Sequence, residues 1–184
     1  MTSFRQGGKR RIDRILDPDY LVSLPTMELD DLRQRRHEAE QEEVDLSYIR
    51  RLLQGHIDIF RAEQHRRAAG DEDDVVEHLA EVLADEQPAP AHGLGRHIAL
   101  EPSEPGIHRR RYEEVLNDAS LSNVRGLSDE ALANAESRFD ENEHLVSTLR
   151  RAVQQIMDRC SDEIARRYRD GEADVTSLLA GDKL

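Results

Sequence analysis

The chain has 184 residues, of which 35% are charged and only 37% hydrophobic, and its formal net charge is −13. This composition argues against a thick apolar core and favours long helices that bury one face, with some disorder. No apolar run approaches the ~18 residues of a membrane-spanning helix, and no apolar segment follows the basic N-terminus as in a secretory signal. We therefore expect a cytoplasmic protein that does not engage a membrane.

The distribution of charge and cysteine narrows the class further. One cysteine, Cys160, excludes an internal disulfide framework and a cysteine-rich metal site. The negative charge argues against general nucleic-acid binding, so no direct binding to DNA is expected. Residues 71–105 contain ten acids and one Arg, whereas residues 1–14 carry a net charge of +4. A local basic site outside the acidic segment is therefore compatible with the overall charge.

The chain divides into five segments. They are a basic tail, a first long helix, an acidic linker containing Pro and Gly, a second long helix and a C-terminal tail, over residues 1–25, 26–70, 71–126, 127–170 and 171–184. Thr26 and Ser128 are predicted to cap the two long helices. Short helices are expected at 71–86 and 108–117 within the linker. Residues 9–14 of the basic tail are interpreted as a solvated end.

An apolar seam with coiled-coil spacing runs along each long helix. Its members in the second helix are Leu132, Ala135, Phe139, Val146, Leu149, Val153, Ile156 and Cys160, and in the first Leu32, Ala39, Leu46, Ile49, Leu53 and Phe60. The first seam is weaker because Arg35, Glu42 and His56 fall on it; His56 is interpreted as a boundary packing residue and Cys160 as seam core. Each helix has one apolar stripe, and no other apolar surface in the sequence is available to cover it. We therefore predict an all-α fold in which two long helices form an antiparallel coiled-coil hairpin, with short linking helices.

A polar motif, E-x3-S-x2-R-x3-Q-x3-D, occurs twice at an offset of 100 residues. Its members are Glu43, Ser47, Arg50, Gln54 and Asp58 in the first helix and Glu143, Ser147, Arg150, Gln154 and Asp158 in the second. On a helix the five side chains fall in a strip about 80° wide and about 22 Å long, beside the seam. A solvated coiled-coil flank or a recent duplication would also give such strips. Neighbours such as Val44/His144 and Ile59/Arg159 have diverged, however, and this contrast favours a ligand surface.

The residue types of the motif suit a guanine-containing ligand. An Arg fork matches a phosphate or the O6 and N7 edge of guanine, and Asp can accept from the N1–H and N2–H2 donors on the other edge. Ser and Gln add shorter hydrogen bonds to phosphate or base. An antiparallel helix pair with opposed motif centres has a pseudo-twofold axis, which matches a twofold-symmetric guanine ligand.

The doubled motif resembles that of the RsiG family, actinomycete anti-sigma factors controlled by cyclic di-GMP, and both copies match at all five positions. The resemblance implies that the ten motif residues bind cyclic di-GMP as two molecules. It also implies a partner, the flagellar-type sporulation sigma factor WhiG, which the dinucleotide holds against the anti-sigma factor. The sigma factor is then kept from RNA polymerase and sporulation genes stay silent.

Two other classes of function compete with this interpretation. A structural or adaptor coiled coil without a ligand would carry the same seams. An enzyme such as a dinucleotide phosphodiesterase is disfavoured because no cluster of His and Asp metal ligands is evident. No metal site is predicted, since His92 and His97 lie in the linker without matched ligands. No catalytic residue is predicted either, because nothing supplies Ser47 or Ser147 with a base and an oxyanion hole.

Overall fold

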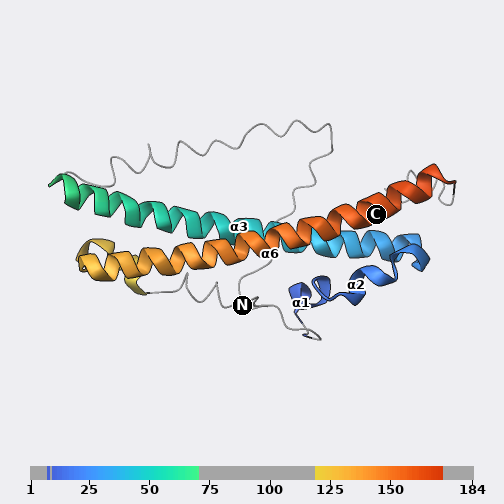
Figure 1. Cartoon of the computed structure of the whole chain (residues 1–184), viewed down its shortest axis with the longest axis horizontal. Helices are drawn as coiled ribbons and strands as arrows, with labels where there is room; N and C mark the ends of the chain where they lie inside the picture. Colours follow the sequence, from blue (N-terminus) through green and yellow to red (C-terminus); the bar gives the residue numbers. More distant parts are fainter. Residues whose placement is uncertain (1–7, 9, 71–118, 172–184) are drawn as a thin grey trace. The chain divides into compact units, whose positions relative to one another are not determined.

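The computed structural model describes residues 8, 10–70 and 119–171. The elements in chain order are α1 (Arg11–Ile15), α2 (Asp19–Val22), the 3-10 turn η1 (Leu24–Thr26), α3 (Leu29–Ala69), the 3-10 segment η2 (Ala119–Gly126) and α6 (Asp129–Arg169) (Figure 1). The described residues contain no strand. The all-α fold with two long helices is therefore confirmed, whereas the short helices expected at 71–86 and 108–117 lie outside the described residues.

The chain divides into two compact units, and each contains a part of both long helices. The first unit consists of Met1–Asp45 and Thr148–Leu184, and the second of Leu46–Ser147. In the first unit Arg33, near the start of α3, donates a hydrogen bond to the hydroxyl of Tyr168, near the end of α6. In the second unit Arg67, near the end of α3, contacts Asp129 at the start of α6. The helices therefore run antiparallel within each unit, as predicted.

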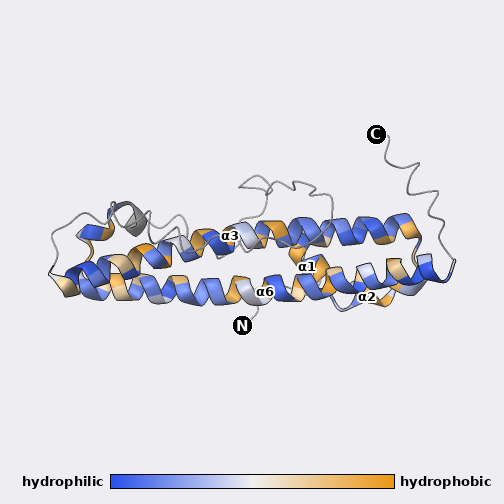
Figure 2. Cartoon of the chain, turned by 90° about the horizontal axis from the view of Figure 1, so that it is seen from above, coloured by the Kyte–Doolittle hydropathy of each residue, from blue (hydrophilic) through white to orange (hydrophobic). Residues whose placement is uncertain are grey.

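The predicted seams form the core. Every seam residue is buried: Leu32, Ala39, Leu46, Ile49, Leu53 and Phe60 in α3, and Leu132, Ala135, Phe139, Val146, Leu149, Val153, Ile156 and Cys160 in α6. In the second unit the Phe60 and Phe139 rings meet edge to face with centroids 5.3 Å apart, and the His56 ring lies 5.4 Å from that of Phe139. His56 is thus a boundary packing residue. Hydrophilic residues predominate along both long helices (Figure 2).

The ends of the long helices follow local chemistry, with one correction. The Ser128 hydroxyl accepts a hydrogen bond from the backbone N–H of Ala131 at 3.2 Å, which confirms the predicted cap of α6. Gly70 and Gly171 follow α3 and α6 with φ of 69° and 74°, a left-handed conformation that stops a helix. The predicted cap by Thr26 is wrong: Thr26 ends the separate turn η1, which contains Pro25, and α3 begins only at Leu29.

The interpretation of residues 9–14 as a solvated end is wrong for the described residues 10–14. Ile12 and Ile15 of α1 are 3% and 0% exposed, and they pack in the first unit together with the buried Tyr20. Arg11 donates a hydrogen bond to the buried Glu42 at 2.7 Å and another to Asp45. The basic segment therefore neutralises acids of α3. Glu42, which interrupts the apolar seam of α3, is the residue that Arg11 binds.

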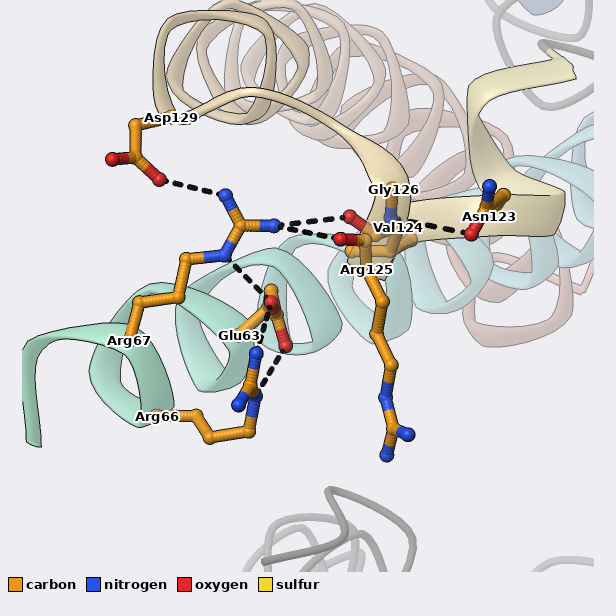
Figure 3. A network of polar contacts seen from close by, with 8 residues as sticks. All are labelled: Glu63, Arg66, Arg67, Asn123, Val124, Arg125, Gly126 and Asp129. Atoms are coloured by element: carbon orange, nitrogen blue, oxygen red, sulfur yellow. Dashed lines mark hydrogen bonds and ion pairs between the residues drawn. The ribbon is translucent and has the colours of Figure 1, made fainter. Parts of the chain in front are cut away.

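A second repeated motif, E-x2-R-R, closes the ends of the hairpin. In the second unit Glu63 accepts hydrogen bonds from Arg66 and Arg67, and Arg67 reaches the carbonyls of Val124 and Arg125 in η2 (Figure 3). In the first unit the counterparts 100 residues later do the same: Glu163 accepts from Arg166 and Arg167, and Arg167 donates to the carbonyls of Leu24 and Met27 at 2.6 Å. Each helix thus ends in a clamp that holds the turn preceding the other helix.

Candidate functional site

The motif residues lie on the surface beside the buried seam, as their helical spacing predicts. Nine of the ten side chains are partly exposed and Asp158 is exposed, whereas their seam neighbours Leu46, Leu53, Val146 and Val153 are buried. Polar side chains so placed contribute little to the core. Their exposure places them within reach of another molecule.

In the first unit the motif residues of both helices form a cluster around Glu43. The Oε1 atom of this α3 residue accepts hydrogen bonds from two α6 side chains, Arg150 at 2.9 Å and Gln154 at 3.0 Å. The Arg150 side chain retains 30% of its exposure and the Glu43 side chain 18%. The ion pair is therefore within reach of solvent and of a charged ligand.

In the second unit the same contacts recur with the helices exchanged. Glu143 of α6 lies 3.6 Å from the guanidinium of Arg50 on α3 and accepts a hydrogen bond from Gln54 at 3.4 Å. It also accepts a bond from the Ser147 hydroxyl at 2.8 Å. The bond from Gln54 is donated by its amide nitrogen, while its amide oxygen is buried without a hydrogen-bond partner in the described parts of the chain. This cluster is looser than the first, and one of its acceptors is unsatisfied.

We call these two groups the Glu43 cluster (Glu43, Arg150, Gln154) and the Glu143 cluster (Glu143, Arg50, Gln54, Ser147). In each, a glutamate of one helix neutralises an arginine of the other. A partly exposed ion pair contributes at most about 1 kcal/mol to folding, because water screens it and two long side chains lose freedom. A phosphate group can therefore displace the carboxylate from the guanidinium at modest cost and take a bidentate place.

The two clusters bring together seven of the ten predicted site residues and do not include Ser47, Asp58 or Asp158. Asp158 is exposed in the C-terminal half of α6. Asp58 lies near Arg61, whose pKa is raised chiefly by its hydrogen bond to Glu136, with a smaller contribution from the charge of Asp58. The Asp158 carboxylate is therefore accessible to a molecule outside the chain.

The sequence did not predict which side chains pair across the helices. Opposed copies of one motif place the glutamate of each copy near the arginine of the other, so the repeat and the antiparallel direction together contain this information. Among the residues that the structure describes, no group of three or more His, Cys, Asp or Glu side chains could hold a metal ion. The described helices also include none with the length and apolar character needed to cross a bilayer. His92 and His97 lie outside the described residues.

Fold and site together define a class: a two-helix coiled-coil protein with a duplicated polar cluster beside its seam. Residues 18–83 match the family model described as RsiG-like, which confirms the resemblance to RsiG over that segment. The RsiG-like family is a family of anti-sigma regulators and not of enzymes. No curated protein matches the chain.

Proposed function

We propose that this chain is a cytoplasmic anti-sigma factor that binds two molecules of cyclic di-GMP through its duplicated stripe. With the ligand it sequesters a flagellar-type sporulation sigma factor, the WhiG of actinomycetes, from RNA polymerase. The observation that carries the proposal is the exchange symmetry of the two clusters. Glu43 faces Arg150 and Gln154, and Glu143 faces Arg50 and Gln54. Two equivalent clusters on one chain suit two identical ligands.

The chemistry of each cluster fits a guanine dinucleotide. When the ligand arrives, the arginine exchanges its glutamate partner for a phosphate or for the O6 and N7 atoms of guanine. The released glutamate and the aspartate of the same stripe accept hydrogen bonds from the N1–H and N2–H2 donors. Ser147 and the amide groups supply the remaining short contacts. The same side chains thus hold the helix pair before binding and the ligand afterwards.

The charge of the chain explains why the ligand would need a second protein. Cyclic di-GMP carries two negative phosphates, and the chain itself has a net charge of −13. A partner that encloses the ligand removes water from the arginine–phosphate contacts and so strengthens them. By thermodynamic linkage, the ligand then raises the affinity of the two proteins for each other by the same factor.

Purification of the tagged chain from its own cells tests this function against a ligand-independent adaptor coiled coil. We expect mass spectrometry to find cyclic di-GMP and one sigma factor bound to the wild-type chain. The Arg50→Ala/Arg150→Ala chain should recover neither, whereas Arg159→Ala, which removes an exposed arginine outside the stripe, should recover both. A protein partner recovered equally by all three chains without a nucleotide would identify an adaptor instead.

A further inference from the structure

The α3 helix carries a third stripe that neither the seam nor the polar motif uses. Tyr48, Leu52, Gly55 and Ile59 fall within about 60° of one another around the helix, and their centre lies about 130° from both the seam and the polar stripe. All four belong to the second unit. Tyr48 is 47% exposed, and Leu52 and Ile59 are partly exposed. We call this surface the outer face of α3.

The internal repeat provides a control for the outer face. The positions on α6 that correspond to it carry Thr148, Ala152, Gln155 and Arg159. The repeat therefore keeps the seam and the polar stripe but not the apolar character of this face. Since α6 pairs with α3 without such a surface, helix pairing does not require it.

Gly55 supplies an independent observation at the centre of the outer face. A glycine inside a helix weakens that helix relative to alanine, so it usually has a local reason. A Cβ atom added at Gly55 would meet nothing within 4 Å in the described structure. The described part of the chain therefore does not require glycine here, whereas the close approach of another backbone would require it.

We propose that the outer face of α3 is where the sigma factor docks, with a helix of the partner crossing at Gly55 and packing against Tyr48. This rests on the proposed function. One exposed tyrosine and two partly exposed aliphatic side chains form a patch of at most a few hundred Å². A stable complex needs about 800 Å² per partner, so this patch is too small to hold a second copy of the chain by itself.

A partner that already covers the polar stripe can extend its contact onto the outer face. Arg51 lies between Asp58 of the stripe and Gly55 of the outer face around the helix, so the two surfaces are continuous on α3. The outer face also lies within residues 18–83, the segment that matches the RsiG-like family. A partner bound in this way contacts α3 and α6 unequally, which gives one sigma factor a single orientation although both helices carry the same motif.

Paired substitutions at repeat-equivalent positions test this docking surface. Gly55→Ala and Tyr48→Ala change the outer face, and Gln155→Ala and Thr148→Ala are the matched controls on α6. Sigma factor capture is measured by surface plasmon resonance with saturating cyclic di-GMP, and the melting temperature of each free chain by circular dichroism. We expect Gly55→Ala to raise the melting temperature and yet to weaken capture about tenfold, as expected for a central interface position. Tyr48→Ala should weaken capture similarly, and both controls should bind as the wild type does.

The outcomes separate the docking surface from the proposed function. The docking surface alone is overturned if Gly55→Ala and Tyr48→Ala capture the sigma factor as well as the wild type does. It is also overturned if the α6 controls weaken capture as much as these two variants do. A free chain that is dimeric by light scattering and becomes monomeric with Tyr48→Ala also overturns it, because a second copy then occupies the face. A wild-type chain that captures no sigma factor in saturating ligand contradicts both the proposed function and this proposal.

Discussion

Glu43 and Arg150 are joined across the two long helices at 2.9 Å, and their repeat counterparts Glu143 and Arg50 face each other at 3.6 Å with the helices exchanged. One motif, duplicated and opposed, therefore produces the same ion pair in each unit. These pairs are partly exposed, so they can open for an anionic ligand without disturbing the buried seam.

The arginines of these pairs are expected to carry most of the ligand affinity. Arg50→Ala or Arg150→Ala should weaken the binding of cyclic di-GMP about 10- to 100-fold, because a lost hydrogen bond to a charged group costs about 1.5–3 kcal/mol. Titration calorimetry measures the affinity, and helical content by circular dichroism should remain unchanged. Arg159→Ala is the control for loss of one positive charge. Unchanged affinity in both stripe variants would contradict the assignment of the site.

The aspartates of the motif are expected to select guanine. Adenine presents N1 as an acceptor and lacks the 2-amino group, so Asp58 and Asp158 would face no matched donors in cyclic di-AMP. We expect cyclic di-GMP to bind at least about 100-fold more tightly than cyclic di-AMP, in line with sites built to pair buried polar groups. A competition titration with the two dinucleotides measures the ratio. A ratio near one would show that the aspartates do not recognise the base.

The N-terminal segment is expected to stabilise the hairpin through Arg11. Arg11→Ala removes the positive charge that the buried Glu42 and Asp45 face, and breaking a buried ion pair costs about 3–5 kcal/mol. Urea unfolding measures the loss in free energy of unfolding. Arg14→Ala is a suitable control, since Arg14 is exposed and its one ion pair in the described structure, with the partly exposed Glu38, is long at 3.7 Å. A loss no larger than that of the control would mean that the segment is not an integral part of the first unit.

The sequence predicts those features of this structure that depend on residues close together in the chain, and it fails where the interacting residues are far apart. The seams repeat every three or four residues over 40 positions, so the buried residues and helix pairing could be predicted. The role of Arg11 could not, because its partners Glu42 and Asp45 lie about 30 residues away and nothing local links them. The capping by Thr26 failed because the turn around Pro25 is held by Arg167 from the far end of the chain. The clamp residues Arg67 and Arg167 also correspond at the 100-residue offset of the repeat, so this pair could have been found from the sequence.

The clamps also predict a pH dependence of stability. Hydrogen bonds from Arg66 lower the pKa of Glu63 from 4.5 to about 2, and those from Arg166 lower the pKa of Glu163 to about 2. Because the folded-state pKa is depressed, this stabilisation is fully present above the unfolded value near 4.5 and is lost as the pH falls toward 2.

The free energy of urea unfolding between pH 6 and pH 2 measures the effect. The wild-type chain should lose more stability below pH 4.5 than Glu63→Gln/Glu163→Gln does, whereas the exposed Glu130→Gln should follow the wild type. Curves that run parallel over this range would show that the clamps do not depend on the two carboxylates.

The central claim is that cyclic di-GMP joins this chain to its sigma factor. The most direct measurement is a pull-down of purified WhiG-type sigma factor by the wild-type chain, with and without cyclic di-GMP, beside the stripe variant Asp58→Ala/Asp158→Ala. We expect capture by the wild type only when the dinucleotide is present, and little or no capture by the variant in either buffer. Equal capture by the wild type in ligand-free buffer would contradict the account, because the dinucleotide would then not be what holds the two proteins together.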